Sequence, residues 1–298
     1  MTEQVLRIGV LGTSRIAPFA LLRPATQLEG VEVVGIASRS RVRAERVAKR
    51  WNIPNIFSDY EQLINDSNVD AIYNPLPNSL HAHWTIEALN AGKHVLCEKP
   101  IATGVEEAQA MLNAEKNSTA KLAEAFHYRY HPVTLRVLEL LRKGTIGDVE
   151  RIHCKFHFPL ISSQDIRYQP ELGGGATMDL GCYCIHQIRL YGGGEPHVIG
   201  AEAKVSSSGV DRLMQADFRF ENGIEASMSC AFMSWDVFGI SSTIEGSKGK
   251  IEVFNPIGPH VHHSIKVVSN QWWTEHVDAK STYYYQLDAF RKHVLLGE

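Results

Sequence analysis

The sequence predicts an α/β fold with two domains: a doubly wound parallel sheet over residues 1–124, then an α+β domain over residues 125–298 with a large, open, mostly antiparallel sheet. The first domain alternates short apolar runs with helical patterns, as strands and crossover helices do. From residue 149 onward, runs of alternating apolar and polar side chains indicate antiparallel strands with one open face. The 298 residues, 44% of them hydrophobic, are enough for two cores.

Helix starts separate the strands of the first domain. Ser58 with Glu61, and Thr103 with Glu106, have the spacing of a capping box, in which each side chain pairs with an otherwise unpaired N–H at a helix start. The apolar runs predict strands at residues 6–11, 31–37, 56–57, 71–73, 94–97 and 121–125. Because strands and helices alternate throughout, we expect one doubly wound sheet.

The second domain is predicted to contain further strands and two strong helices. The strands lie at residues 151–158, 198–205, 213–220, 225–232, 241–245, 250–254 and 262–268. The helices cover residues 175–191 and 282–296, and residues 126–132 form the expected crossover between the domains. No repeat, low-complexity tract or long polar linker interrupts the sequence, so we expect a tight connection near residue 125.

The composition excludes several classes of partner. A net charge of -3 without Lys/Arg runs argues against a nucleic-acid-binding protein. The apolar stretch at residues 5–11 is too short for a signal peptide or a membrane span. Five scattered cysteines fit the reduced thiols of a cytoplasmic protein better than a disulfide framework. We therefore expect a cytoplasmic protein that binds a small molecule rather than DNA, RNA or a membrane.

A glycine turn follows the first predicted strand and opens the first helix. Residues 12–17 match the dinucleotide-binding pattern G-x-G-x-x-G/A, except that serine replaces the second glycine, which normally lets the backbone approach a pyrophosphate. Serine is small, so the pattern is weakened rather than lost. A turn without a ligand is the alternative. The residues expected to contact the dinucleotide here are Gly12, Thr13, Ser14, Arg15 and Ile16.

The end of the second strand favours NADP over NAD. An acidic residue at this point binds the ribose 2′-hydroxyl of NAD, whereas this chain has Ser38 and Arg39. Hydroxyl groups and a guanidinium suit a 2′-phosphate, because arginine binds phosphate in a fork and stacks on adenine. Arg41 and Arg43 follow, and a solvated helix face explains them better than a ligand role.

The loops after the fourth and fifth strands complete the expected cofactor site, since doubly wound sheets bind ligands at the carboxyl ends of their strands. Two alternatives stay open: Asn78 as the N-cap of a helix that begins near Ser79, and His81 as a histidine with structural hydrogen bonds only. After the fifth strand, a lysine can lie beside a bound nicotinamide. The expected contacts are Pro75, Leu76, Asn78, His81, Glu98 and Lys99.

Four short motifs, each modest on its own, together resemble one family. They are the Gly12 turn, residues 77–81 (PNSLH), residues 92–95 (GKHV) followed by Glu98, Lys99 and Pro100, and residues 173–183 (GGGATMDLGCY). The combination is similar to the glucose-fructose oxidoreductase, inositol dehydrogenase and rhizopine catabolism (Gfo/Idh/MocA) superfamily over nearly the whole chain. Tyr183, in place of histidine, resembles the branch of NADP-dependent D-xylose dehydrogenases and dimeric dihydrodiol dehydrogenases.

The resemblance implies a fold, an activity and an assembly. It implies a Rossmann domain, followed by an open mixed sheet whose outer face forms a homodimer or a dimer of dimers. It also implies an NADP-dependent oxidoreductase that acts on a hydroxyl of a sugar, polyol or cyclic diol. Relatives continue past the position of Glu298 for about one more helix that packs back on the first domain, so we expect a longer native chain.

Hydride transfer from a carbinol needs a group that takes the hydroxyl proton and a group that holds the oxygen. We expect Tyr183 to exchange the proton, Lys99 to stabilise its phenolate and hold the oxygen, and Asp179 to orient the sugar or the lysine. Proton transfer by Lys99 itself is the alternative. Helical spacing puts Asp179, Tyr183 and His186 on one face. Arg167 and His186 are expected sugar contacts, with purely structural roles as the alternative.

Two other functions use the same fold. A glycosidase with tightly held NAD needs an acidic residue where this chain has Arg39. A catalytically silent regulator lacks the lysine–tyrosine pair, which this chain has. A metal site at Cys182, Cys184 and His186 is disfavoured, because helix residues two apart point in different directions.

Overall fold

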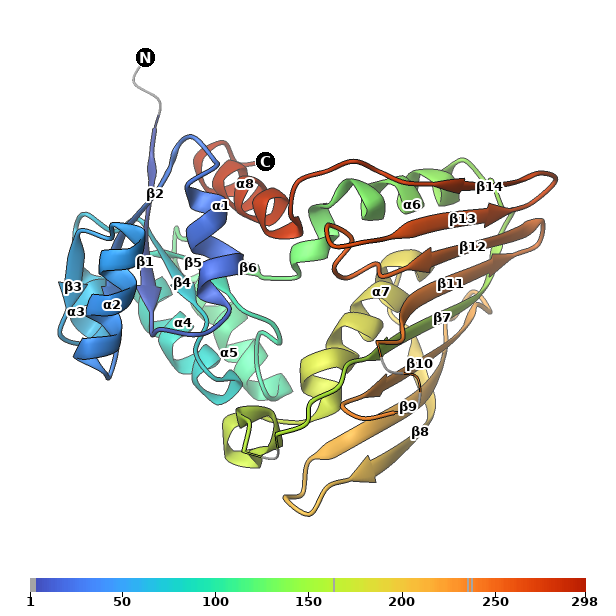
Figure 1. Ribbon diagram of the computed structural model, residues 1–298, viewed down its shortest axis with the longest axis horizontal. Coiled ribbons are helices and arrows are strands. Elements are labelled where there is room, and N and C mark those ends of the chain that lie inside the picture. Colours follow the sequence, from blue (N-terminus) through green and yellow to red (C-terminus); the bar gives the residue numbers. More distant parts are fainter. Residues whose placement is uncertain (1–3, 163, 235, 237) are drawn as a thin grey trace. The chain divides into compact units, whose positions relative to one another are not determined.

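The computed structural model describes residues 4–162, 164–234, 236 and 238–298. It divides into two compact units, Met1–His127 together with Tyr283–Glu298, and Tyr128–Thr282 (Figure 1). Each unit contains one β-sheet with its own helices. Within the described residues, none of the helices combines the length and apolar character that a membrane crossing requires.

The first unit is built on a parallel sheet with the strand order β3-β2-β1-β4-β5-β6. Its strands are β1 (Leu6–Leu11), β2 (Val31–Ala37), β3 (Asn55–Phe57), β4 (Ala71–Asn74), β5 (His94–Cys97) and β6 (Leu122–Glu124). Strands β2 and β3 lie on one side of β1, and strands β4, β5 and β6 lie on the other. The chain therefore changes its direction across the sheet between β1 and β4, which makes a switch point at the carboxyl ends of these two strands. The predicted doubly wound sheet is confirmed, and each strand lies within one residue of its predicted ends.

The two faces of this sheet carry separate hydrophobic cores, because side chains alternate along each strand. In β4, Ala71 and Tyr73 belong to one core and Ile72 to the other. The first core packs against η1 (Pro18–Leu22), α1 (Arg23–Ala25), α2 (Arg41–Trp51) and α8 (Thr282–Leu295). The second core packs against α3 (Tyr60–Asn65), α4 (His81–Asn90) and α5 (Val105–Lys116).

Helix α8 differs from the prediction in its domain. The sequence pattern assigns residues 282–296 to the second domain, but nearly all of α8 groups with the first unit. Leu287 and Phe290 are buried in the core that contains β1, and Tyr283 and Val294 pack beside them. These four residues follow the i, i+4, i+7, i+11 spacing of one helix face. The chain therefore returns to the first unit, because that apolar face completes its core.

Two helix starts are displaced by one residue from their predicted caps. Asp59, rather than Ser58, caps α3 by accepting a hydrogen bond from the N–H of Gln62 at 2.8 Å. Thr103 donates from its N–H and its hydroxyl to Glu107, at 2.8 and 2.6 Å, and not to Glu106. An aspartate directly before the first helical residue is as good a cap as serine, so the spacing alone did not distinguish them.

The second unit contains a sheet with the strand order β14-β13-β12-β11-β7-β10-β9-β8. Its strands are β7 (Val149–His157), β8 (His197–Val205), β9 (Asp211–Arg219), β10 (Glu225–Ala231), β11 (Ile240–Gly246), β12 (Gly249–Phe254), β13 (Ser264–Val268) and β14 (Trp272–Glu275). Among these strands β7 and β10 pair in parallel, and the other neighbours are antiparallel. The predicted mostly antiparallel sheet is confirmed; the sequence missed β14, a short edge strand with an exposed first residue, Trp272.

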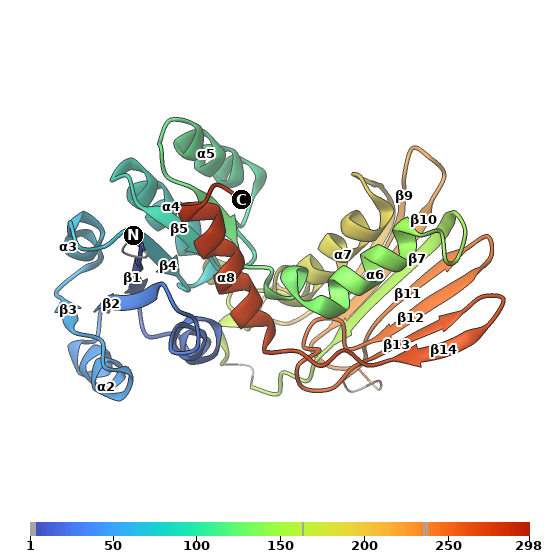
Figure 2. The ribbon, with the colours of Figure 1, turned by 90° about the horizontal axis from the view of Figure 1, so that it is seen from above.

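One face of this sheet is covered by helices and the other is open. Figure 2 shows α6 (Pro132–Arg142) and α7 (Cys182–Gly192) lying on the same face of the strands. In β7, Ile152, Cys154 and Phe156 are buried, whereas Arg151 and His153 are exposed. This alternation is the pattern that predicted a half-open sheet.

Candidate functional site

The turn after β1 has the conformation that its glycine requires. Gly12 has φ of +80°, in the left-handed region, and its N–H donates to the carbonyl of Ala37 at 2.7 Å. A Cβ at this position would lie 3.0 Å from Cδ2 of Leu76. Ser14, at the degenerate position of the pattern, accepts a hydrogen bond from the N–H of Ala17 at 3.3 Å. This hydrogen bond ties the serine to the residue directly before the π-helical turn at Pro18.

The end of β2 presents a buried serine followed by an exposed arginine. Ser38 is buried and accepts a hydrogen bond from the N–H of Ser40 at 3.3 Å, while Arg39 is exposed. Burial raises the pKa of Tyr60, and the charges of Arg39 and Arg43 oppose this shift. Both guanidinium groups are therefore close enough to act on the phenol, whose oxygen lies 3.7 Å from the Cβ position of Gly12. A cationic and aromatic surface thus adjoins the glycine turn.

The loop after β4 is tied to the loop after β5 by His81. The ring of His81 is buried, with Nδ1 2.8 Å from the carbonyl oxygen of Pro100 and Nε2 2.8 Å from that of Leu76. Burial lowers the pKa of His81, and the two carbonyls oppose that shift. Both ring nitrogens are thus used within the protein, so His81 joins the two loops. Asn78 opens the short 3-10 helix η2 (Asn78–Leu80), and the N-cap of α4 is Leu80, which excludes Asn78 as the cap of that helix.

Glu98 and Lys99 follow β5 directly. Glu98 is buried, and its Oε1 accepts a hydrogen bond from the hydroxyl of Tyr73 at 2.7 Å. Burial and the adjacent Glu98 raise the pKa of Tyr73, so the phenol keeps its proton and donates it. Lys99, the next residue, is half-buried. Since all these strands are parallel, Gly12, Ser38, Pro75 and Lys99 come at the carboxyl ends of β1, β2, β4 and β5, on one edge of the sheet.

In the second unit, Tyr183 lies among aromatic rings. Its side chain is only 5% exposed, and its ring centroid is 5.6 Å from that of Phe156 and 5.9 Å from that of Tyr128. The predicted helix at residues 175–191 begins with a wider π-helical turn, η6 (Thr177–Gly181), before α7. Asp179 lies in this turn and accepts a hydrogen bond from Nε of Arg167 at 2.7 Å. The structure thus brings together two predicted residues, Asp179 and Arg167, as an ion pair.

His186 is held by a buried phenol. The hydroxyl oxygen of Tyr128 lies 2.6 Å from Nδ1 of His186, and the rings meet edge to face at 5.6 Å. Burial, with smaller effects from Arg129 and Arg189, lowers the pKa of His186 to about 4. Burial also raises the pKa of Tyr128, so the phenol remains protonated and can donate to Nδ1. In that arrangement the proton of the neutral imidazole is on Nε2.

Both halves of the chain match profiles of one family. Residues 6–126 match the oxidoreductase family with an NAD-binding Rossmann fold, and residues 134–252 match the GFO/IDH/MocA C-terminal domain. The chain belongs to the Gfo/Idh/MocA oxidoreductase family. The family expected from the four sequence motifs is therefore confirmed.

Relatives of this Gfo/Idh/MocA chain include enzymes with named substrates. It is 33% identical to D-xylose 1-dehydrogenase (NADP(+)) 2 of Haloferax volcanii, over 98% of this chain and 90% of the relative. It is 30% identical to trans-1,2-dihydrobenzene-1,2-diol dehydrogenase of Xenopus laevis, over 82% of this chain and 74% of the relative. The 3-ketoreductase KijD10 of Actinomadura kijaniata, solved with NADP and TDP-benzene, is similar with a TM-score of 0.92, at 29% identity, over 99% of this chain and 91% of that chain.

The sequence analysis did not predict two residues that lie beside the expected site residues, Tyr60 and Asp165. Tyr60 begins α3 and carries no signal of its own, because its place beside the Gly12 turn arises only in the folded chain. Asp165 has the spacing of a helix cap before Arg167, and this local signal could have been found. Among the described residues, no group of three His, Cys, Asp or Glu side chains is placed to hold a metal ion.

Proposed function

We propose that this protein is an NADP-dependent oxidoreductase that transfers hydride between the nicotinamide and a hydroxyl-bearing carbon of a sugar, polyol or cyclic diol. The observation that carries the proposal is the edge of the parallel sheet. There the Gly12 turn, Ser38 with Arg39, the Pro75 loop and Glu98 with Lys99 follow four strands. Relatives named for D-xylose with NADP and for a dihydrodiol support the substrate class.

The residues of the first unit fit an NADP molecule. The left-handed backbone of Gly12 makes the tight turn that precedes a pyrophosphate site, and a Cβ there would press on Leu76. Arg39 supplies a charge for the 2′-phosphate, and Ser38 replaces the acidic residue that NAD requires. Tyr60, near both guanidinium groups, is a further proposed contact of the adenosine end. Thr13, Arg15, Ile16 and Asn78 remain proposed cofactor contacts.

The proposed mechanism assigns one task to each polar group. When bound, the nicotinamide supplies the hydride acceptor. Tyr183 takes the hydroxyl proton, and Lys99 stabilises its phenolate, because a nearby ammonium favours the charged form of a phenol whose ordinary pKa is about 10. Lys99 also donates a hydrogen bond to the reacting oxygen. His186, protonated on Nε2, donates to a substrate hydroxyl, and Asp179 orients the lysine or the sugar.

A substrate screen tests this function. Purified protein is incubated with aldoses, inositols and cyclic diols and with either NADP or NAD, and the nicotinamide absorbance is followed. Reduction of NADP by at least one sugar or diol, with a lower rate for NAD, is the expected result. No reduction of either cofactor would contradict the proposal and favour a silent dinucleotide-binding regulator.

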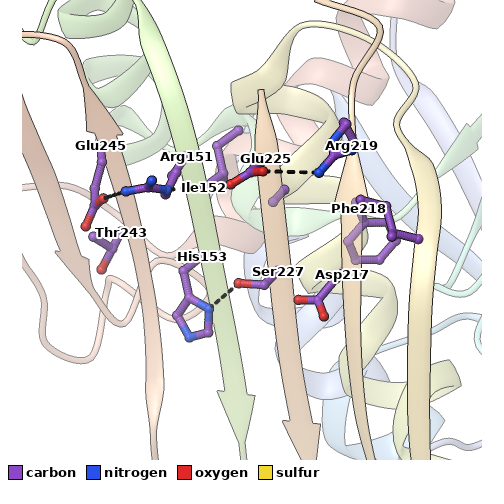
Figure 3. Close-up of a pocket in the computed structure, with 12 residues that line it drawn as sticks. Arg151, Ile152, His153, Asp217, Phe218, Arg219, Glu225, Ser227, Thr243 and Glu245 are labelled. Atoms are coloured by element: carbon purple, nitrogen blue, oxygen red, sulfur yellow. Dashed lines mark hydrogen bonds and ion pairs between the residues drawn. The ribbon is translucent and has the colours of Figure 1, made fainter. Parts of the chain in front are cut away.

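We also propose that the open face of the second sheet binds a second copy of the chain. Figure 3 shows two rows of side chains across this face. The first row alternates in charge and pairs within itself: Arg219 and Arg151 both contact Glu225, at 3.2 and 3.7 Å, and Arg151 contacts Glu245 at 3.6 Å. The side chains of the neighbouring row are polar, and Nδ1 of His153 lies at hydrogen-bond distance, 2.9 Å, from the hydroxyl of Ser227.

This face suits a self-complementary interface. The charges of its first row, on Arg219, Glu225, Arg151 and Glu245, are already paired with one another, and Asp217 adds one further carboxylate to the face. The hollow between the rows has a volume of about 400 Å³ and includes the apolar side chains of Ile199 and Phe218. Sedimentation velocity should give a dimer for the native protein and a monomer for Ser227→Arg, which adds a long side chain to the lining of the hollow. A monomeric native protein would refute the interface.

The five free cysteines support a reducing location, and we propose the cytoplasm.

A further inference from the structure

One guanidinium bridges two carboxylates in the second unit. Arg167 donates from Nε to Oδ2 of Asp179 at 2.7 Å and from Nη1 to Oδ1 of Asp165 at 3.1 Å. The backbone N–H of Arg167 donates to the same oxygen of Asp165, also at 3.1 Å. Both carboxylate side chains are only 18% exposed. Asp165 therefore anchors Arg167 from one side, and the guanidinium presents Nε to Asp179 on the other.

The glycines at residues 173–175 hold this arginine in place. A Cβ on Gly174 would lie 2.5 Å from the carbonyl oxygen of Arg167 and 2.9 Å from that of Gln169, closer than any side chain allows. Gly175 has φ of +125°, and its N–H donates to the carbonyl of Arg167 at 2.9 Å. The glycine motif singled out in the sequence thus has a packing role: it lets the chain pass directly against the backbone of Arg167.

The turn that carries Asp179 is also held by hydrogen bonds. Thr177, at the start of the π-helical turn, donates from its N–H and its hydroxyl to Oδ2 of Asp211, at 2.8 and 2.7 Å. This turn carries Asp179, four residues before Tyr183. Arg167 and Asp179 therefore meet between two segments that are each fixed by hydrogen bonds.

We propose that Arg167 is a positioning residue for Asp179, and not a direct contact of the substrate. The inference rests on the proposed function. Two largely buried carboxylates share one cation, so without Arg167 each would lose a charge-assisted hydrogen bond that orients it. Asp179 and Asp165 raise the pKa of Arg167, against the opposite effect of burial, so the cation persists throughout the pH range of activity. The pair holds Asp179 in one orientation in the turn that leads into the helix of Tyr183.

The test compares Arg167→Met, Arg167→Lys, Asp179→Asn and the double variant Arg167→Met/Asp179→Asn. For each, kcat, KM, the pH profile of kcat/KM and NADPH affinity are measured on the best substrate of the screen. Arg167→Met should lower kcat about 10- to 100-fold, the range for a charge-assisted hydrogen bond, with KM nearly unchanged. The acid limb of the pH profile of kcat/KM should move to higher pH in this variant. Arg167→Lys should recover part of kcat, and the double variant should be no slower than Asp179→Asn.

Two matched controls separate positioning from general stability. Arg136 forms a comparable half-buried ion pair with Glu275, at 2.7 Å, so Arg136→Met should lower the melting temperature and leave the pH profile unchanged. Gly174→Ala should reproduce the loss of kcat, whereas Gly194→Ala should not, because a Cβ on Gly194 meets nothing within 4 Å.

Two results would overturn the inference. In the first, Arg167→Met raises KM at unchanged kcat, and the loss of kcat/KM in the double variant equals the product of the losses in the two single variants. Arg167 is then a substrate contact. In the second, the native protein turns over no sugar or diol, so the proposed function fails and the role of Arg167 fails with it. Normal turnover by the native protein distinguishes the first result from the second.

Discussion

Tyr128 and His186 form a buried hydrogen-bonded pair, with 2.6 Å between the phenol oxygen and Nδ1. Tyr128 is fully buried and lies just before α6, whereas His186 is on α7, three residues after Tyr183. A phenol that donates to one ring nitrogen leaves the other as the donor. The pair therefore determines which hydrogen bond His186 offers, one helical turn from the proposed proton carrier.

Tyr128→Phe should raise the pKa of His186 slightly above about 4, because the donated hydrogen bond favours the neutral ring, while burial, the main cause of the low pKa, remains. Long-range ¹H–¹⁵N NMR titration measures this shift and the tautomer. We expect kcat/KM to fall about two- to tenfold at neutral pH, the range for a neutral hydrogen bond. Tyr130→Phe is the control, since Tyr130 is a neighbour that contacts Arg129 instead. An unchanged titration curve in Tyr128→Phe would show that the pair does not control His186.

Lys99→Met should reduce kcat by about 10²- to 10⁴-fold, the usual contribution of acid–base groups, and leave NADPH affinity within about threefold. The variant removes the ammonium that is proposed to favour the phenolate of Tyr183, while the proposed cofactor contacts of Gly12 and Arg39 remain. Single-turnover kinetics and NADPH fluorescence titration measure the two effects. Lys121→Met, at an exposed lysine of the same unit, should match the native enzyme. Retained turnover in Lys99→Met would eliminate the proposed mechanism.

Arg39→Glu should shift cofactor preference from NADP to NAD. The new carboxylate repels a 2′-phosphate and can accept a hydrogen bond from a ribose hydroxyl. We expect kcat/KM for NADP to fall about 10- to 100-fold, with the rate for NAD unchanged or increased. Arg46→Glu, an exposed change of equal charge on α2, should leave the preference as it is. Equal losses in both variants would mean that net charge, and not Arg39, determines the preference.

Gly12→Ala should weaken NADPH binding and destabilise the first unit. Alanine pays a conformational cost at φ of +80°, and its Cβ would press on Leu76. Gly92→Ala carries a similar backbone cost at φ of +75° but meets nothing within 4 Å. The difference between the variants therefore isolates the crowding at the turn. Fluorescence titration should show an affinity loss for Gly12→Ala alone; equal affinities would exclude Gly12 from the pyrophosphate site.

Stability should fall as pH decreases from about 6.5 toward 4, because His131 resists protonation in the fold. Burial lowers its pKa to about 4, while the unfolded chain has a pKa near 6.5 and takes up the proton first. The stability contribution is complete above about pH 6.5 and is lost at about 1.4 kcal/mol per pH unit below it. Nδ1 of His131 accepts the N–H of Val133 at 3.2 Å and so caps α6.

His131→Asn tests this origin. Asparagine retains a cap for α6 but does not titrate, so the melting temperature should depend less on pH between about 4.5 and 6.5. His186 still contributes in this variant, since its pKa is also about 4. An undiminished pH dependence in His131→Asn would assign the effect to other groups.

Local patterns were sufficient for most of the architecture. Short apolar runs located the strands of the first sheet. Side-chain alternation located those of the second sheet and predicted its open face, because alternation reports directly on which side of a sheet is buried. The glycine turn and the serine–arginine pair predicted a phosphate site at one edge of the first sheet, since each lies within a few residues of a strand end, and that site remains a proposal. Edge strand β14 was missed because four residues with an exposed tryptophan carry little periodicity.

The sequence by itself determined the two sheets, the family and the residue types of the site, because all of these depend on local spacing. Only the tertiary structure decided which partners those residues take: Arg167 with Asp179, Tyr128 with His186, and α8 with the first core. These contacts join segments up to 284 residues apart, such as Leu6 and Phe290, which share the first core. Pairings of this kind arise from complementary shape and charge in the packed chain, and no local pattern encodes them.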